Sequence, residues 1–415
     1  MLPKAGPLSK GSVFEKISGN NSEYLQRKFT SLIAYAATAY YKKIRVGFVI
    51  GNGIHALPCV LGFRLLNNTG IDIKYMYIQR KVVINMQTPK LFAILPDYVA
   101  TPDGMATASN GDLVLACPNY ADPSKPGCIL RFDANKNVRK WVDVPVSEET
   151  GHAFPMGIAF GPDGDLYICD NQGWSGAPEL LFKGRILRLR IDGDRIVKTT
   201  VVAKNMEHPN GMRIKDGFIY VTQSMLSKEK DPSGKLLSCV YKFALDDEDI
   251  DITNTLKDKN ILTTFITLNP DCQYGVDGIE FDHNGDLLIG NFGDGAVHRI
   301  KFNDDGTVKE NKVWAKDESQ LQTTDGMVID DAGNLYIADF SANAIGMVTP
   351  EGKVVRIAQS PDTDGLHGEL DQPGEPTIWK GKLVISCFDL VTGPDKVNTA
   401  HEMPATMSEL ELYRA

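Results

Sequence analysis

The sequence lacks the cysteine pairs that a disulfide framework or a zinc site would need. Its seven cysteines are odd in number, and none of them forms a Cys-x-x-Cys pair. We therefore expect reduced and mostly buried thiols. The cysteines are Cys59, Cys117, Cys128, Cys169, Cys239, Cys272 and Cys387.

Clustered positive charge and long apolar runs are also scarce. The net charge is −9, and no Lys/Arg cluster with interleaved aromatic residues offsets it, which argues against a nucleic-acid partner. The apolar run from Arg45 to Leu66 is interrupted by Gly, Asn, His and Pro before it could span a bilayer, so we favour an irregular N-terminal extension over a signal anchor. We expect no membrane partner and a cytoplasmic protein, with a secreted or periplasmic one as the alternative.

A repeat organises the chain from about residue 100 onward. The stretches "VDGIEFDHNGDLLIGNF" (276–292) and "TDGMVIDDAGNLYIADF" (324–340) are two of its six copies. Each copy has a polar or special residue, a short apolar strand, a turn rich in Asp, Asn and Gly, and a second strand, which is the pattern of a β-hairpin. The six copies start at Asp103, Met156, Asn210, Asp277, Asp325 and Glu375.

The period of about fifty residues leaves room for two further strands after each hairpin. Four strands per unit and six units predict an all-β fold, a six-bladed β-propeller. The last blade lacks a fourth strand, and "PKLFAILPDY" (89–98) is an unassigned strand before the first hairpin. We predict that this N-terminal strand joins the C-terminal blade and closes the ring, so residues 86–415 form the propeller and residues 1–85 an extension of unknown role.

The first strand of each propeller blade lines the central channel, so the six starting residues should converge there. Four of them are carboxylates, which would repel one another unless a cation neutralises them. Oxygen donors favour Ca²⁺, with Mg²⁺ or Mn²⁺ next, over Zn²⁺. The alternative is that Asp-Gly is only a strand-entry turn, although turn chemistry alone does not account for Glu375 or Met156 at this position.

Two of these stretches resemble a known family. "HPNGM" (208–212) and "VDGIEFD" (276–282) resemble the metal-ligand motifs of the SMP-30/gluconolactonase/LRE-like lactonases and of the related diisopropylfluorophosphatase and paraoxonase propellers. The resemblance covers roughly residues 86–415. It implies a Ca²⁺-type cation held by Glu375, in "EPTIW", together with Asn210 and Asp277.

The order of these ligands around the ring resembles that of the family if the chain is circularly permuted by one blade. Where the family has a further Asn ligand, this sequence has Met156, which serves a hard cation poorly. Water or a substrate oxygen would fill that position, or else Asp103 or Asp325 would.

The resemblance implies a metal-dependent hydrolase, a lactonase or esterase that opens a small sugar or organic lactone. Asp277 would act as general base or as nucleophile, or else only as a metal ligand. Among the histidines of the loops that enter the inner ring, His208, two residues before Asn210, is the favoured proton shuttle, and the alternative is that it is a surface or supporting residue. A non-enzymatic binding propeller, or a phosphotriesterase or lyase-like reaction on the same scaffold, is the alternative. We expect a monomer, whose small-molecule substrate is contacted by Asp103, Met156, Asp325, His152, His367 and Trp174.

Overall fold

The computed structural model describes residues 59–67, 70–78, 86–272, 274–393 and 397–413. The chain divides into two compact units, Met1–Val83 with Ala415 and Ile84–Arg414, and each is described by itself. In the first unit, β1 (Cys59–Asn67) pairs antiparallel with β2 (Gly70–Ile78). This part of the extension is therefore a hairpin rather than irregular, and the remainder of the apolar run, residues 45–58, lies outside the described residues.

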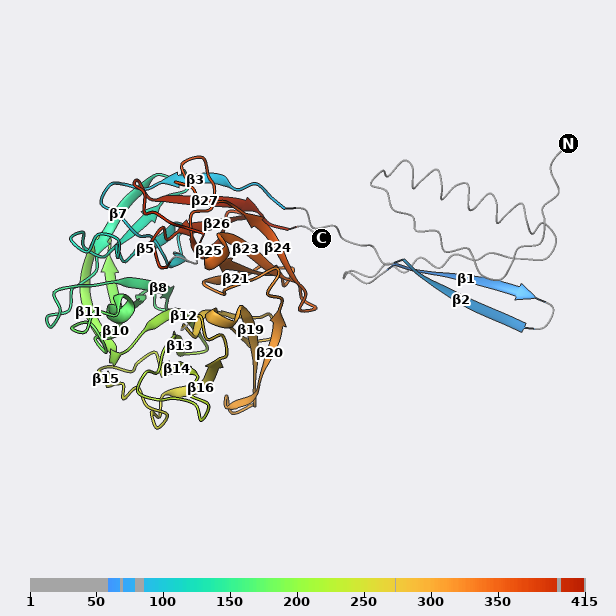
Figure 1. The fold of residues 1–415 in the computed structure, drawn as a ribbon, viewed down its shortest axis with the longest axis horizontal. Coiled ribbons are helices and arrows are strands. Elements are labelled where there is room, and N and C mark those ends of the chain that lie inside the picture. The colour runs from blue at the N-terminus through green and yellow to red at the C-terminus, as the bar shows by residue number, and fades with distance from the viewer. Residues whose placement is uncertain (1–58, 68–69, 79–85, 273, 394–396, 414–415) are drawn as a thin grey trace. The chain divides into compact units, whose positions relative to one another are not determined.

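The second unit is the predicted six-bladed β-propeller, in which six sheets surround a central channel (Figure 1). Three blades have four strands in sequence order. The first blade comprises β4 (Met105–Thr107), β5 (Leu113–Cys117), β6 (Cys128–Phe132) and β7 (Val138–Asp143). The fourth comprises β17 (Val276–Phe281), β18 (Leu287–Asn291), β19 (Ala296–Phe302) and β20 (Val308–Lys316). The fifth comprises β21 (Met327–Ile329), β22 (Leu335–Asp339), β23 (Ala344–Val348) and β24 (Val354–Gln359).

The second and third blades differ by one short strand. β15 (Ile250–Asp251) lies in sequence within the third blade but pairs in parallel with β11, so the second sheet has five strands. The second blade comprises β8 (Pro155–Phe160), β9 (Leu166–Asp170), β10 (Gly184–Asp192) and β11 (Arg195–Met206), and the third comprises β12 (Pro209–Lys215), β13 (Phe218–Gln223), β14 (Leu236–Ala244) and β16 (Ile261–Thr267).

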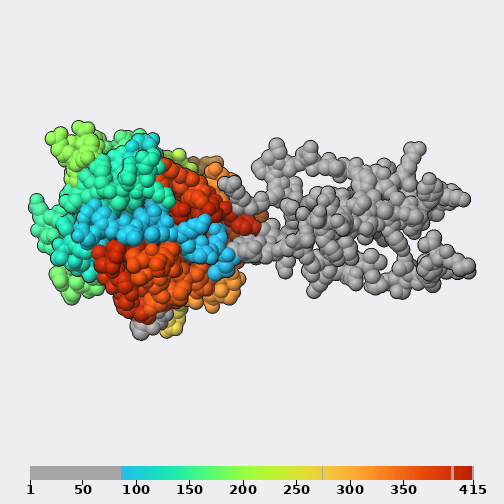
Figure 2. Space-filling model, turned by 90° about the horizontal axis from the view of Figure 1, so that it is seen from above, coloured from blue at the N-terminus to red at the C-terminus, as the bar shows by residue number. Residues whose placement is uncertain are grey.

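The last blade closes the ring as predicted. Its strands are β25 (Pro373–Trp379), β26 (Lys382–Cys387), β27 (Thr406–Glu411) and, from the other end of the chain, β3 (Lys90–Ile94). Figure 2 shows this N-terminal segment, in blue, lying against the red C-terminal strands. The ring of Phe92 on β3 lies 5.5 Å from that of Phe132 in the first blade and 5.7 Å from that of Trp379 in the last, so β3 also contributes to the core between them.

The glycine that follows the inner-ring residue of a blade has a structural reason. A Cβ on Gly157 would lie 2.3 Å from the carbonyl oxygen of Asn210 in the next blade, and one on Gly211 would lie 2.6 Å from that of Asp277. Such distances are too short for any side chain, so the backbone of each blade can approach its neighbour only because these residues are glycine. Gly104 and Gly278 contact the next blade in the same way.

The last blade departs from this pattern by one residue. Gly211 donates its N–H to the hydroxyl of Thr222, at 2.8 Å, and Glu375 donates its N–H to the hydroxyl of Ser386, at 3.0 Å. The pairing of Pro209 with Gln223 and of Pro373 with Cys387 gives the same alignment. Glu375 therefore occupies the place of the ring glycine, and Gly374 the place of Asn210 and Asp277, so the sequence-based register of this blade was wrong by one residue.

Candidate functional site

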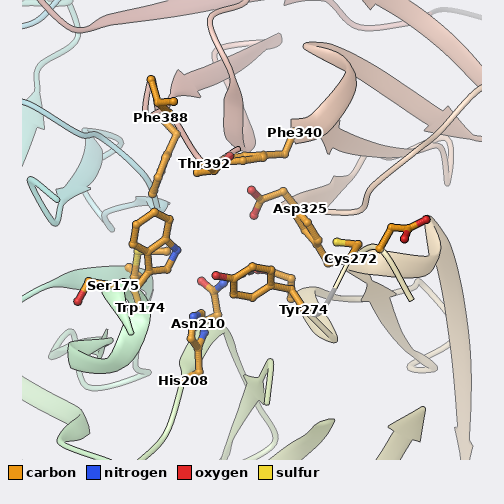
Figure 3. Close-up of a pocket in the computed structure, with 15 residues that line it drawn as sticks. Trp174, Ser175, His208, Asn210, Cys272, Tyr274, Asp325, Phe340, Phe388 and Thr392 are labelled. Atoms are coloured by element: carbon orange, nitrogen blue, oxygen red, sulfur yellow. Dashed lines mark hydrogen bonds between the residues drawn. The ribbon is translucent and has the colours of Figure 1, made fainter. Parts of the chain in front are cut away.

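A pocket of about 360 Å³ lies at one mouth of the channel. Polar side chains from the starts of three first strands reach it, namely Asn210, Asp277 and Asp325, and Met156 borders it from the second blade. In Figure 3, Asn210 and His208 lie on one side of the pocket and Asp325 lies across from them. The prediction that the inner-ring residues converge at the channel therefore holds for these four.

Aromatic side chains form the walls of the pocket. Short 3₁₀ turns follow the second strand of three blades: η1 (Gln172–Ser175), η2 (Phe292–Asp294) and η3 (Phe340–Ala342). They carry Trp174, Phe292 and Phe340 into the wall. Figure 3 shows Trp174 and Phe340 together with Phe388, which occupies the corresponding place after β26. Trp174 lies 5.5 Å from Phe388 between ring centroids, which gives the pocket a continuous apolar side.

The channel carboxylates are close enough to perturb one another. Asn210 donates from Nδ2 to Oδ2 of Asp277, at 2.6 Å. Burial, and then the charge of Glu375, raise the pKa of Asp277. Burial, followed by the charge of Asp277, also raises the pKa values of Asp103 and Asp325. Several acids thus share a buried volume in which their ionised forms are disfavoured.

Glu375 points away from this pocket, toward an arginine that the sequence analysis did not single out. Its Oε1 accepts a hydrogen bond from Nη2 of Arg213, at 3.4 Å, and the same guanidinium contacts Glu280 through Nε, at 3.1 Å. Burial raises the pKa of Glu375 to about 8, against the opposing effect of Arg213. Because Glu375 stands at the glycine position, its side chain lies against Gly326 instead of among the pocket residues.

His208 lies in the pocket wall and is almost fully buried. Its Nδ1 lies 3.1 Å from Nδ2 of Asn171. An amide nitrogen only donates, so with the amide in this orientation Nδ1 accepts and Nε2 carries the ring proton. Nε2 is buried without a hydrogen-bond partner. Desolvation lowers the pKa of His208 to about 4, so the ring is neutral at pH 7.

The other predicted substrate-binding residues divide into three groups. Met156 and Trp174 line the pocket with Asp325. Asp103 is buried but does not line the pocket. Its Oδ1 packs against Gly374, and a Cβ on residue 374 would lie only 2.9 Å from that oxygen. His152 stacks on Phe154 and His367 is exposed, and neither is among the residues that line the pocket.

Several pocket residues carried no recognisable signal in the sequence. Tyr274, Val391 and Thr392 come from loops whose sequence does not follow the repeat. Arg213 and Glu280 each stand three residues after a ring residue, on first strands, and a charged residue in a short strand resembles an ordinary solvent-facing position.

Comparison with known proteins agrees with the propeller fold. Residues 296–365 match the family model described as the SMP-30/gluconolactonase/LRE-like region, which confirms the resemblance to that family. The matched segment includes Asp325 but not Asn210, Asp277 or Glu375. Among curated proteins, none matches the chain by sequence.

Solved structures with the same fold include a gluconolactonase from Xanthomonas campestris, at 15% identity and a TM-score of 0.50, covering 80% of this chain and 96% of that one. The calcium-binding protein regucalcin from Agrobacterium tumefaciens strain C58 matches at 14% identity and a TM-score of 0.52, and the match covers 80% of this chain and 99% of that one. A luciferin-regenerating enzyme matches at 12% identity and a TM-score of 0.52, and the match covers 78% of this chain and 95% of that one. These likenesses show the shared fold. Within the described residues, no helix is long and apolar enough to cross a membrane.

Proposed function

We propose, from the family resemblance and the pocket together, that the protein is a metal-dependent hydrolase that opens a small sugar or organic lactone. The observation that carries the proposal is the grouping of Asn210, Asp277 and Asp325 at the mouth of the channel, beneath an aromatic wall. Oxygen donors and an apolar wall in one pocket suit a substrate that has a carbonyl and a carbon ring.

The donor set fits a hard divalent cation. Burial and mutual repulsion raise the pKa values of Asp103, Asp277 and Asp325, which is the state expected of carboxylates that lack a compensating charge. Among the described residues, the one basic side chain paired with a channel carboxylate is Arg213, and it contacts Glu375 rather than the pocket acids. We expect Ca²⁺, with Mg²⁺, Mn²⁺ and Zn²⁺ as less suited alternatives.

Asn210, Asp277 and Asp325 would hold the cation in this proposal. Asn210 presents its oxygen to a cation if its amide is rotated, since the two ends of an amide have nearly the same shape. A bound cation of this kind supplies Lewis acidity that polarises a lactone carbonyl. The ligand role that the resemblance implies for Glu375 stays a prediction, and the ion pair with Arg213 is the role that we propose in its place.

The chain's own groups would carry the proton transfers. Asp277 can accept a proton from the attacking water, provided that it is ionised. His208, whose low pKa keeps its ring neutral at pH 7, would present Nε2–H to the pocket without a protein partner and donate a hydrogen bond to a substrate oxygen. Trp174, Phe340 and Phe388 would hold the apolar face of the lactone ring and exclude water.

The experiment is to measure the metal content of gently purified protein and then its hydrolysis of a panel of lactones with and without a chelator. We expect about one divalent cation in the channel and lactone hydrolysis that stops on chelation. A protein whose hydrolysis is insensitive to chelation, or one that hydrolyses no lactone when loaded with calcium, would contradict the proposal. Hydrolysis of a phosphotriester instead would identify different chemistry at the same pocket.

A further inference from the structure

A second group of acids lies outside the residues that line the channel pocket. Asp371 precedes β25, whereas Asp389 and Glu402 both lie in the loop between β26 and β27, so two segments of the last blade bring the three acids together. Each offers one carboxylate oxygen, and these oxygens lie within 4.8 Å of one another. Among the described residues, no other three acidic, histidine or cysteine side chains converge in this way, the channel acids included.

The hydrogen bonds of this group leave several oxygens unused. Asp389 is engaged, since its Oδ2 accepts the N–H of Glu402 at 2.9 Å and its Oδ1 accepts Nδ2 of Asn398 at 3.2 Å. Oδ1 of Asp371 and Oε2 of Glu402 are buried and have no hydrogen-bond partner. Two carboxylate oxygens that are shielded from water and left without a partner need a donor or a cation.

Asn398 gives an independent indication of a ligand. Its side chain is only 2% exposed, and its Oδ1 is buried without a partner while its Nδ2 contacts Asp389. The amide is thus held at the edge of the acid cluster with its acceptor unsatisfied. An oxygen of this kind, beside carboxylates, is a usual ligand of a hard cation.

The charge of the cluster is poorly compensated. Burial, and then the charges of Asp389 and Glu402, raise the pKa of Asp371 to about 9. In the ion pairs of the described residues, the one basic group that contacts the cluster is His401, whose Nδ1 lies 3.0 Å from Oδ2 of Asp389. The same Nδ1 lies 2.6 Å from the backbone oxygen of Asp389, so the ring nitrogen is already engaged there.

We propose that Asp371, Asp389, Glu402 and Asn398 form a second divalent-cation site, of the Ca²⁺ class, that is separate from the channel. Every donor is an oxygen, and all four residues lie outside the strands, which suits the irregular coordination of Ca²⁺ better than the tetrahedral nitrogen and sulfur sites of Zn²⁺. The site ties the segment before β25 to the loop between β26 and β27. That loop also carries Val391 and Thr392 into the wall of the pocket, so the cation holds one side of the pocket in place.

The test is thermal unfolding of the full chain in chelator and in calcium, carried out in an Asp277→Asn background that disables the proposed channel ligand. We expect calcium to raise the unfolding midpoint of this variant by several degrees, because a ligand that binds only the folded state stabilises it. Adding Asp371→Asn should remove that rise. The double variant should also be at least as stable as its parent in chelator, since an amide cannot ionise and so never adds a negative charge beside Asp389 and Glu402.

Asp246→Asn serves as the matched control, because Asp246 is an exposed carboxylate in the third blade. It should keep the full calcium response, and Glu402→Gln should lose it as Asp371→Asn does. A calcium response that persists in both cluster variants, or that is absent from the Asp277→Asn chain, would overturn the proposal.

Calorimetric titration with calcium separates this proposal from the proposed function. If both sites bind, the native chain takes up two ions, and Asp277→Asn and Asp371→Asn each remove a different one. One ion that Asp371→Asn removes and Asp277→Asn leaves would support the loop site while contradicting the channel site. One ion that only Asp277→Asn removes would overturn the loop site.

Discussion

One residue of register in the last blade decides which side chain reaches the pocket. The stretch "GEPTIW" places a carboxylate before an apolar run, and an alignment by polarity matches Glu375 with Asn210 and Asp277. The strand pairing instead matches Gly374 with them. Polarity could not separate the two alignments, because a single glycine and a single glutamate exchange places and the apolar residues after them fit both.

Glu375→Gln tests the role of this carboxylate. We expect the channel to keep its calcium affinity to within about threefold, because Glu375 is paired with Arg213 and is not among the residues that line the pocket. Glu280→Gln is the matched control, since Glu280 contacts the same guanidinium. Calcium titration of both variants is the measurement, and a Glu375→Gln chain that loses channel calcium while Glu280→Gln retains it would show that Glu375 is a ligand.

Gly326→Ala tests how closely Glu375 packs against the fifth blade. A Cβ there would lie 1.9 Å from Oε2 of Glu375, so we expect a loss of about 1–3 kcal/mol in the free energy of unfolding. The same substitution in a Glu375→Gly chain should cost less, because the carboxylate that it meets has been removed. Denaturant unfolding of the native chain, the two single variants and the double variant gives the coupling energy between residues 326 and 375. Equal costs of Gly326→Ala in both backgrounds would contradict this packing.

Among the strands, the ring closure could be predicted because each repeat unit should contain four of them. Five blades complete themselves, the last is one strand short, and "PKLFAILPDY" is the strand left over. The two-residue strand β15 could not be predicted, since its pairing with β11 depends on where a loop returns in space and a segment so short has no periodicity.

Phe92→Ala tests the closing strand β3. Phe92 is buried between the rings of Phe132 and Trp379, so we expect a loss of about 3–5 kcal/mol in the free energy of unfolding. Leu91→Ala is the matched control on the same strand: Leu91 is 36% exposed and should cost less than about 1 kcal/mol. Equal losses from the two substitutions in a denaturant series would show that β3 does not seal the last blade against the first.

For the molecule as a whole, the ring of polar residues around the channel could be predicted from the sequence, whereas the full lining of the pocket could not. The repeat predicts which residues reach the channel, because blade geometry repeats with it. The loops do not repeat, so Tyr274 and Thr392 could be placed only once the fold had brought them together. The same holds for Arg213, whose charge is balanced by residues 67 and 162 positions away along the chain.

The buried carboxylates should make the stability of the metal-free protein depend on pH. Burial raises the pKa values of Asp103, Asp277 and Glu375 to between about 7 and about 8 in the metal-free fold. The neutral forms are favoured in the folded state, so stability is greatest below the ordinary carboxyl pKa and is lost as pH rises through these values. We expect the unfolding midpoint in chelator to fall by on the order of 5 °C or more between pH 5 and pH 8.

Calcium should reverse this trend, because it binds the ionised carboxylates and becomes more effective as they deprotonate. The measurement is thermal unfolding from pH 5 to pH 8 in chelator and in excess calcium. The control is the Asp277→Asn/Asp371→Asn chain, in which the calcium effect should vanish. A metal-free midpoint that rises from pH 5 to pH 8 would contradict the assignment of uncompensated acids to the channel.

The rate of lactone hydrolysis by metal-stripped protein, as calcium is returned, tests the proposed metal site most directly. We predict that the native chain recovers its activity with calcium, whereas Asp277→Asn stays at least about a hundredfold slower while unfolding with an unchanged cooperative transition. Hydrolysis that is equally fast without calcium, or that survives in folded Asp277→Asn, would contradict the claim that the channel acids form a metal-dependent lactonase site.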